Sequence, residues 1–225
     1  MLKAISRLAI FVAISLSLTL TVAAQDKRQN EPGQFDFYVL ALSWSPSFCA
    51  AASERASGRP PLQQCGERPY SFVVHGLWPQ YEKGFPEYCQ RDKTRIDRDL
   101  VTSMLDLMPA PPLIYRQWDK HGTCSGLPPR AYFDTVRKAR ALMKIPPQYL
   151  QVTAPLTVTP DEIEDAFVGA NPGMTREAIA VRCDSQRLSE VRVCLTKDFR
   201  FRDCAEIDRH ACRRDKLVMP PVRGG

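Results

Sequence analysis

The sequence predicts a single α+β domain that contains an antiparallel sheet. Short runs of aromatic and β-branched residues, which favour strands, lie towards both ends of the chain. Several stretches between them space their apolar residues as helices do. Residues 188–195 alternate between apolar and polar side chains, which is typical of an antiparallel strand with one solvated face. No internal repeat, low-complexity tract or linker divides the chain, so one domain is expected.

Residues 1–24 have the pattern of a secretory signal peptide. Lys3 and Arg7 form a charged start, an apolar run follows, and Val22-Ala23-Ala24 fits a small-residue cleavage site. A membrane anchor is the alternative, but Ser and Thr residues interrupt the apolar run, which is short for a bilayer span. We therefore expect residues 25–225 to form one exported domain, periplasmic or extracellular, with no membrane contact after signal removal.

Charge and cysteine content narrow the class of protein further. The chain has a formal charge of +6; removal of Lys3 and Arg7 with the signal leaves 29 basic and 25 acidic residues, a charge of +4. This mild excess fits an anionic partner without requiring one. An even number of cysteines in an exported chain predicts disulfides, and none has the paired spacing of a zinc site. The eight cysteines are Cys49, Cys65, Cys89, Cys124, Cys183, Cys194, Cys204 and Cys212.

The first third of the mature chain predicts two strands. Residues 25–34 are polar and are expected to be a loose leader; residues 35–44 form a first strand, which Pro46 and its neighbours end. The segment between Cys49 and Cys65 is expected to be a loop or short helix. Residues 71–74 form a second, short strand with His75 at its end, and residues 76–79 turn the chain away.

Helices and shorter strands follow. Helices are predicted at 97–108, 113–121 and 129–144, and another begins with Thr159 as its N-cap and runs to about Gly169. Gly122 is expected to end the second of these in the left-handed conformation. The acidic start of the last helix is interpreted as a solvated first turn. Strands are predicted at 178–183, 188–196, 199–202 and 217–219.

The helix from residue 113 carries a candidate site. At 3.6 residues per turn, Gln117 and His121 lie between an apolar flank and a cationic flank formed by Arg116 and Lys120. A histidine at such a boundary, beside two cations, suits proton transfer to an anion. The alternative is an ordinary amphipathic helix with a surface histidine.

A second histidine makes acid–base chemistry possible. If the helix packs on the second strand, His75 and His121 can face one cleft, and a Cys89–Cys124 bridge would tie the two segments together. A lone histidine at a strand end is more often structural. His210, between Cys204 and Cys212, is interpreted as a surface residue. Two histidines that titrate near neutral pH allow simultaneous acid and base catalysis.

The remaining residues point to RNA as the substrate. Lys120 and Arg116 can neutralise a phosphate and its transition state. Trp78, Tyr81 and Phe85, expected to be exposed, can stack on unpaired bases. No group of acidic residues is placed for a two-metal phosphodiesterase. We therefore expect cleavage of single-stranded RNA by its own 2′-OH, with no metal and no cofactor.

These residues resemble a known family. Ser71-Phe-Val-Val-His-Gly-Leu-Trp-Pro79 and Gln117-Trp-Asp-Lys-His-Gly-Thr-Cys124 look like the two active-site signatures of the ribonuclease T2 family. Asp36-Phe-Tyr-Val-Leu-Ala-Leu-Ser-Trp-Ser-Pro46 resembles that family's first strand. The resemblance covers most of the mature chain and weakens after about Tyr149. It implies a central antiparallel sheet flanked by helices.

The resemblance also implies roles for the site residues. His75 matches the general acid for the leaving 5′-oxygen, His121 the general base on the 2′-OH, and Lys120 the lysine that stabilises the phosphorane. Trp78 matches an aromatic of the upstream base pocket, for which Gln80 and Tyr81 are further candidates. Family members form 2′,3′-cyclic phosphates and then 3′-phosphates; we expect the same here, with low base specificity.

Two positions depart from the familiar family pattern. The usual His-Glu-Trp is Arg116-Gln117-Trp118 in this chain. Gln117 cannot exchange a proton, but it can donate a hydrogen bond to a phosphate oxygen. Arg116 can replace a phosphate-binding histidine if it points inward. Reduced but real activity is therefore expected.

The cysteines are expected to pair in four bridges. Proximity in the chain favours Cys49–Cys65, and the resemblance supports Cys89–Cys124 most. The last four cysteines are expected to nest, with Cys194–Cys204 inside Cys183–Cys212.

Two other hypotheses compete with that of a metal-independent endoribonuclease. Because of Arg116 and Gln117, the chain could be a catalytically silent member that binds RNA or a partner protein. A histidine-based zinc hydrolase has less support, since the three histidines lack ligand spacing. We expect a monomer.

Overall fold

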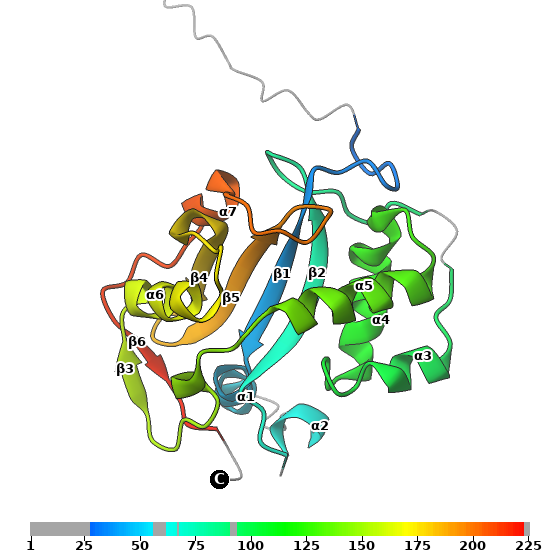
Figure 1. Ribbon diagram of the computed structural model, residues 1–225. Helices are drawn as coiled ribbons and strands as arrows, with labels where there is room; N and C mark the ends of the chain where they lie inside the picture. Colours follow the sequence, from blue (N-terminus) through cyan, green and yellow to red (C-terminus); the bar gives the residue numbers. More distant parts are fainter. Residues whose placement is uncertain (1–27, 56–61, 67, 91–93, 223–225) are drawn as a thin grey trace, which may run out of the picture.

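The computed structural model describes residues 28–55, 62–66, 68–90 and 94–222; the expected signal peptide lies outside these ranges. Four antiparallel strands form the main sheet in the order β2-β1-β5-β4 (Figure 1). They are β1 (Phe37–Trp44), β2 (Phe72–Gln80), β4 (Ile179–Cys183) and β5 (Leu188–Leu195). A separate two-stranded sheet joins β3 (Leu156–Val158) to β6 (Leu217–Met219). β3 is only three residues long and was not predicted from the sequence.

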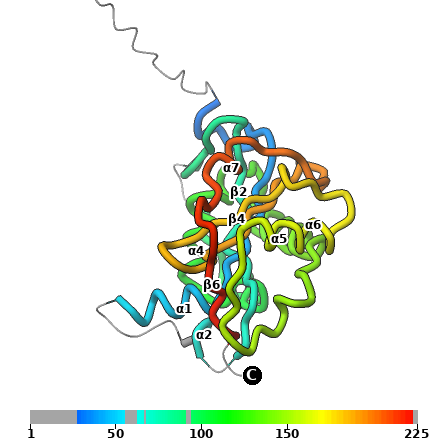
Figure 2. The backbone as a smooth tube through the Cα atoms, turned by 90° about the vertical axis from the view of Figure 1, so that its left-hand side faces the viewer, coloured from blue at the N-terminus to red at the C-terminus, as the bar shows by residue number. Residues whose placement is uncertain are grey.

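Helices pack on this sheet and around its edges. They are α1 (Ser45–Glu54), α2 (Leu62–Cys65), α3 (Arg98–Ser103), α4 (Pro111–Lys120), α5 (Pro129–Leu142), α6 (Pro160–Ala170) and α7 (Ala205–Arg209). Side chains of α5 and α6 join the main core over one face of the sheet, and the side view shows both helices on that side (Figure 2). The expected α+β class with an antiparallel sheet is confirmed.

The second strand is longer than its apolar run predicted. The strand was expected to stop at Val74 and to turn at residues 76–79, but β2 continues to Gln80. Its pairing with β1 passes from Val74 opposite Leu42 to Gly76 opposite Ala41, which leaves His75 as the extra residue of a β-bulge. Val74 and Leu77 both join the main core, whereas Trp78 joins a second apolar cluster on the other face. The bulge therefore changes which side chains face the helices.

Two expected helix ends lie elsewhere. The helix predicted at 97–108 is α3, which stops at Ser103 with Asp97 as its N-cap. Hydrogen-bonded turns follow, and they bring the carbonyl of Leu107 to the backbone N–H of Val74, at 2.9 Å. α4 ends at Lys120, and a short 3₁₀ helix, η1 (Gly122–Ser125), continues the chain.

Gly122 is small for a packing reason and does not adopt the left-handed conformation. The residue with the positive φ of 76° is Gly126, after η1. A Cβ on Gly122 would lie 2.4 Å from the Trp118 ring and 2.9 Å from the Tyr132 ring. Gly122 therefore lets α4 approach α5, and the left-handed turn comes four residues later.

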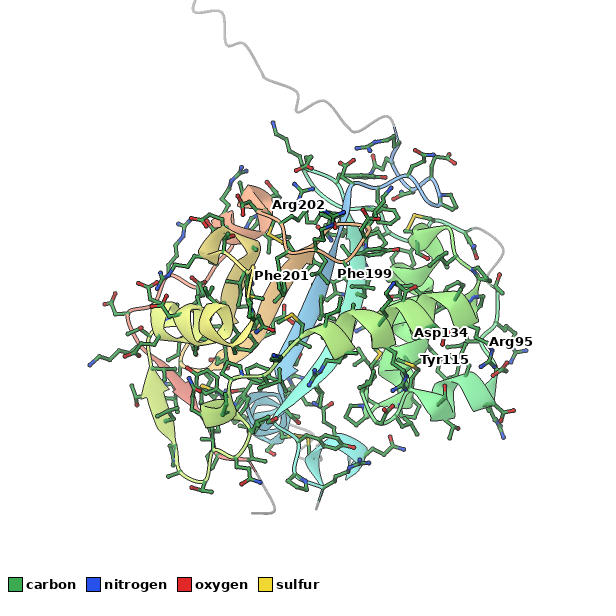
Figure 3. All side chains as sticks on the ribbon, in the orientation of Figure 1. Arg95, Tyr115, Asp134, Phe199, Phe201 and Arg202 are labelled. Atoms are coloured by element: carbon green, nitrogen blue, oxygen red, sulfur yellow. A yellow bond between two sulfur atoms is a disulfide. The ribbon has the colours of Figure 1, made fainter. Side chains whose placement is uncertain are left out.

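The predicted strand at 199–202 is a turn. Phe199 has a φ of 63°, the N–H of Thr196 donates to the carbonyl of Arg200, and only one isolated bridge joins Leu195 to Phe201. Phe199 and Phe201 lie on the loop that follows β5 (Figure 3). By contrast, the expected N-cap of α6 is present, because Thr159 and Glu162 form a reciprocal capping box.

Four disulfides connect these elements. They are Cys49–Cys65, Cys89–Cys124, Cys183–Cys212 and Cys194–Cys204, the pairs expected from the sequence. Cys89–Cys124 joins the loop after β2 to η1, and the last two pairs hold the C-terminal segment against β4 and β5. Nowhere in the described ranges is a helix both long and apolar enough to cross a membrane.

Candidate active site

A cleft of about 500 Å³ gathers most of the predicted site residues. It lies between α4, β2, β5 and α7, and the loop after β2 closes one side. Of the predicted residues, it contains all except Tyr81. Its lining residues are His75, Trp78, Gln80, Gly84, Phe85, Tyr88, Arg116, Gln117, Lys120, His121, Arg192, Glu206, Ile207 and His210.

His75 is held by a carboxylate that no sequence motif indicates. Its Nδ1 lies 2.9 Å from Oε2 of Glu190, a β5 residue that is only 7% exposed. The other oxygen, Oε1, accepts from Nε of Arg192 at 2.6 Å. Burial alone raises the pKa of Glu190, but the hydrogen bonds and charges of His75 and Arg192 outweigh it and hold that pKa below its usual range. Glu190 is therefore ionised, and its carboxylate accepts a hydrogen bond from the Nδ1–H of His75.

Small side chains on β1 allow this contact across the sheet. Glu190 lies opposite Ser43, and Arg192 lies opposite Ala41. Directly opposed residues project from the same face of a sheet. The bulge sends His75 to this face too, so the carboxylate reaches over β1 to the imidazole on β2.

His121 has a different environment. It follows the last turn of α4, its backbone N–H donates to the carbonyl of Gln117, and it is 7% exposed. Its buried Nδ1 has no hydrogen-bond partner among the described residues, which leaves Nε2 as the ring nitrogen that can meet a ligand in the cleft. Burial, then the charges of Lys120 and His75, lower the pKa of His121 to about 3. His121 is therefore neutral at physiological pH.

Trp78 lies between the two histidines. Its ring centroid is 5.2 Å from that of His75 and 5.3 Å from that of His121. The guanidinium of Arg192 lies over the same indole, 5.0 Å from its centroid. Both histidines and a cation thus surround a single indole.

A hydrogen bond fixes how Gln117 faces the cleft. The indole Nε1 of Trp78 donates to Oε1 of Gln117 at 2.7 Å. Indole nitrogen can only donate, so the atom that meets it must be the amide oxygen. The amide nitrogen of Gln117 consequently remains available as a donor at the cleft.

Gly76→Ala should disrupt this arrangement. A Cβ at Gly76 would lie 2.1 Å from Oε1 of Gln117 and 2.3 Å from Nε1 of Trp78. We expect the variant to lose about 1–3 kcal/mol of unfolding free energy, the usual cost of overpacking. Gly169→Ala is the matched control, because nothing lies within 4 Å of that Cβ and alanine favours the helix. Chemical denaturation measures both, and equal stability of the two variants would contradict the packing role of Gly76.

Two cations border the cleft on the α4 side. Lys120 Nζ lies 3.1 Å from Oε2 of Glu87 and 5.5 Å from the centroid of Phe85. Arg116 is exposed and also lines the cleft. The backbone N–H of Tyr88 donates to the carbonyl of Lys120 at 2.9 Å, which ties the loop to the end of α4.

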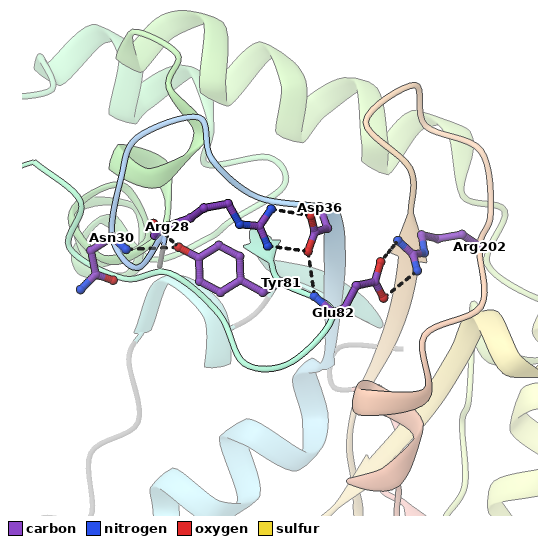
Figure 4. A network of polar contacts seen from close by, with 6 residues as sticks. All are labelled: Arg28, Asn30, Asp36, Tyr81, Glu82 and Arg202. Carbon is purple, nitrogen blue, oxygen red and sulfur yellow. Dashed lines mark hydrogen bonds and ion pairs between the residues drawn. The ribbon is translucent and has the colours of Figure 1, made fainter. Parts of the chain in front are cut away.

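Tyr81 does not reach the cleft, and its prediction as a base-binding residue is wrong. It is 2% exposed, and its hydroxyl donates to the carbonyl of Arg28 at 2.8 Å (Figure 4). The backbone N–H of Asn30 donates to the same hydroxyl, and Arg28 forms a bidentate ion pair with Asp36. Residues 28–34 are therefore not the loose leader that their polarity predicted. Trp78, also expected to be exposed, is 9% exposed.

The cleft also contains residues that were not predicted from the sequence as site residues. Glu190 and Arg192 alternate with apolar residues on β5, but alternation alone does not reveal which strand they face. His210 is an exposed surface residue, as expected, yet it also borders the cleft. Its Nε2 lies 3.7 Å from Oε1 of Glu206, another lining residue that the sequence analysis did not identify.

The fold and the cleft together define a disulfide-bridged α+β protein with a paired-histidine site. In the part of the chain that the structure describes, no group of three His, Cys, Asp or Glu side chains is placed to hold a metal ion. The sequence profile of the ribonuclease T2 family matches residues 35–204. The chain belongs to the ribonuclease T2 family.

Individual relatives show how the match is distributed. A ribonuclease of Aeromonas hydrophila is 40% identical over 118 residues, which are 52% of this chain and 51% of that protein. A probable ribonuclease of Haemophilus influenzae is 34% identical over 131 residues, 54% and 48% of the two chains. The chain thus matches about half the length of these two relatives. Ribonuclease I of Escherichia coli is 24% identical over 88% of both chains.

Solved structures share the fold. Trichomaglin, described as an S-like ribonuclease, superposes with a TM-score of 0.66 at 22% identity, covering 84% of this chain and 99% of that one. An RNase-related protein from Calystegia sepium gives a TM-score of 0.63 at 22% identity, covering 83% and 97%.

Proposed function

We propose that this protein is an exported endoribonuclease that cleaves single-stranded RNA by transphosphorylation. The products are 2′,3′-cyclic phosphates and then 3′-phosphate ends, formed without a metal or other cofactor. The observation that carries the proposal is the difference between the two histidines: His75 is paired with a carboxylate, whereas His121 is neutral and unpaired at Nδ1. Environments that separate two titratable groups in this way assign them acid and base roles.

The assignment gives a balanced first step. Nε2 of neutral His121 accepts the proton of the ribose 2′-OH, and the 2′-oxygen attacks phosphorus. The bond from phosphorus to the 5′-oxygen breaks as His75, protonated and hydrogen-bonded to Glu190, donates its proton to that oxygen. In the second step the roles reverse. His75 accepts a proton from water as the water oxygen attacks phosphorus. The bond from phosphorus to the 2′-oxygen breaks as His121 donates its proton to that oxygen, which leaves a 3′-phosphate.

Charged and polar groups around the phosphate stabilise the transition state. Lys120 and Arg116 supply positive charge from α4, and Arg192 supplies it from β5. The free amide nitrogen of Gln117 can donate to a non-bridging oxygen, although it cannot exchange a proton. We therefore expect activity below that of a family member that carries a glutamate at this position.

The cleft favours unpaired bases of any kind. Phe85 and Tyr88 are 47% and 55% exposed, and aromatic faces stack on all four bases. RNase NT, which shares this fold, has been solved with 5′-AMP, and a variant of RNase MC1 with 5′-UMP. Gln80 is buried, and its amide nitrogen donates to the carbonyl of Pro79. Low base specificity is the corresponding expectation.

Export and a monomeric state complete the proposal. Four disulfides in a chain of this size are typical of an oxidising compartment, either periplasmic or extracellular. The four bridges close loops and add stability outside the cell.

Digestion of single-stranded RNA in EDTA tests this function. We expect cleavage after all four bases, with 2′,3′-cyclic phosphate ends that convert slowly to 3′-phosphates. RNA binding without cleavage would instead support a catalytically silent member of the family. Loss of cleavage in EDTA would support a metal-dependent hydrolase.

The pH dependence of kcat/KM should reflect the low basicity of His121. The base must be neutral to accept a proton, and the pKa of His121 is lowered to about 3, mainly by burial. The acid limb is therefore expected below about pH 5, rather than near the ordinary histidine value of about 6.5. An acid limb near pH 6.5 would contradict the assignment.

Gln117→Glu is expected to move the acid limb of the kcat/KM profile to higher pH. A carboxylate one turn before His121 on the same helix face would stabilise the imidazolium, so the limb should rise by about one pH unit. The same measurement on this variant therefore tests whether the acid limb belongs to His121.

A further inference from the structure

A second hollow adjoins the cleft. It has a volume of about 860 Å³, and Arg182, Cys183 and residues 210–216 line it. His210 lines both the hollow and the cleft, so the two adjoin at this residue. We infer that this hollow, the downstream groove, binds the phosphates on the 3′ side of the cleaved bond. The inference rests on the proposed ribonuclease function.

The groove lies on the side of the cleft where the leaving nucleotide must emerge. In Figure 1, α4 lies beside β2, and β5 and β4 follow towards the opposite edge of the sheet. His121 belongs to the α4 side, His75 to β2, Glu190 to β5 and Arg182 to β4. Because His121 takes the 2′-proton and His75 protonates the 5′-oxygen, the upstream ribose lies towards α4. The strand beyond the 5′-oxygen therefore continues towards β5 and β4.

The groove is strongly basic. Arg182, Arg213, Arg214 and Lys216 line it, and Asp215 is the single acidic residue among its lining. Three of these cations form no ion pair with any described residue: Arg213, Arg214 and Lys216. The backbone that carries these cations is fixed, because Cys183–Cys212 joins their segment to β4 and the N–H of Cys212 donates to the carbonyl of Val181 at 2.7 Å.

Arg182 lies between the downstream groove and Glu190, the carboxylate that holds His75. It lies opposite Glu190 on the neighbouring strand, and its guanidinium donates to the carbonyl of His210. Burial, and then the charge of Arg192, lower the pKa of Arg182. Both carboxylate oxygens of Glu190 already accept hydrogen bonds, one from His75 and one from Arg192. Arg182 and Arg192 are therefore neighbouring positive charges beside a single carboxylate. A phosphate bound between the cleft and the groove would relieve that repulsion.

RNA fits this surface better than an acidic protein segment does. The cations line a groove that adjoins the cleft, and phosphates recur at each nucleotide of a strand held in the cleft. A single strand that makes three such contacts, at a slope of about −0.7 per contact, loses roughly 18-fold in affinity between 50 and 200 mM salt. The groove should therefore act only on longer substrates and mainly at low salt.

Oligodeoxynucleotides with a single ribouridine test the direction of this path, since they contain one cleavable bond. We compare a minimal dinucleotide with substrates extended by four deoxynucleotides on the 3′ side or on the 5′ side. At 50 mM salt the 3′ extension should raise kcat/KM by about tenfold, and at 200 mM the gain should nearly vanish. The 5′ extension should raise it less than about twofold, because the two cations on the α4 side, Lys120 and Arg116, line the cleft itself and already serve the minimal dinucleotide.

The triple variant Arg213→Ala, Arg214→Ala, Lys216→Ala should lose the gain from the 3′ extension and keep cleavage of the dinucleotide, since none of the three lines the cleft. The charge-matched control is Arg98→Ala, Arg130→Ala, Lys144→Ala, three exposed residues outside both hollows, and it should keep the gain. A gain that persists in the first triple variant, or one that follows the 5′ extension, would overturn the groove. Failure of the wild-type protein to cleave even the dinucleotide would instead overturn the proposed function.

Discussion

Replacing either His121 or His75 with alanine should lower kcat/KM for a dinucleoside phosphate by about 10²–10⁴-fold, the usual contribution of one acid–base group. His121→Ala removes the acceptor for the 2′-proton, and His75→Ala removes the donor to the leaving 5′-oxygen. Initial rates of cleavage in EDTA measure the effect. The double variant should lose little more than either single variant, because groups that act in one step are not additive.

Thermal unfolding is the control for both histidine variants. His75→Ala leaves Oε2 of the buried Glu190 without its hydrogen-bond donor, so the unfolding midpoint should fall by roughly 2–10 °C while the protein stays folded at the assay temperature. His121 has a buried Nδ1 without a partner, so its removal should not destabilise the fold through a lost hydrogen bond. Cleavage within a few-fold of wild type in either variant would rule out the assigned role.

Glu190→Gln should lower kcat/KM for a dinucleoside phosphate by about tenfold, the equivalent of about 1.4 kcal/mol. The carboxylate orients the imidazole of His75 through the 2.9 Å hydrogen bond, and a neutral amide does so less well. The acid limb, which belongs to His121, should not move. Glu190 is thus a positioning residue, since it acts through His75.

A structural effect of this substitution would look different. It would also lower the residual rate of the His75→Ala variant, whereas a positioning effect disappears once His75 is absent. Glu164→Gln is the matched control: this second, partly buried glutamate lies on α6 outside the cleft and accepts from the N–H of Val181. Burial raises the pKa of Glu164 to about 7, yet its replacement should leave kcat/KM unchanged.

The sequence predicted the reacting groups better than it predicted their surroundings. The two signature stretches identify His75, Lys120 and His121, and the structure brings these three residues to one cleft. The strand and helix patterns also predicted most elements to within a few residues. These features depend on local spacing, which a single sequence displays directly.

Features that depend on strand register could not be predicted. The bulge at His75 results from the pairing of β2 with β1, and the contact of Glu190 with His75 crosses a whole strand. Nothing near Glu190 in the sequence indicates that Ser43 and Ala41 leave space for it. Tyr81 was misplaced for the same reason, because its partners Arg28 and Asn30 lie about fifty residues earlier in the chain.

The most direct test of the central claim uses two dinucleoside phosphates that differ only in the upstream sugar. Both are incubated with the protein in EDTA, and the products are separated by chromatography. The ribose substrate should be cleaved to a nucleoside 2′,3′-cyclic phosphate, and the 2′-deoxy substrate should remain intact, because it lacks the nucleophile that His121 activates. Cleavage of the deoxy substrate, or no cleavage of the ribose substrate, would contradict the account.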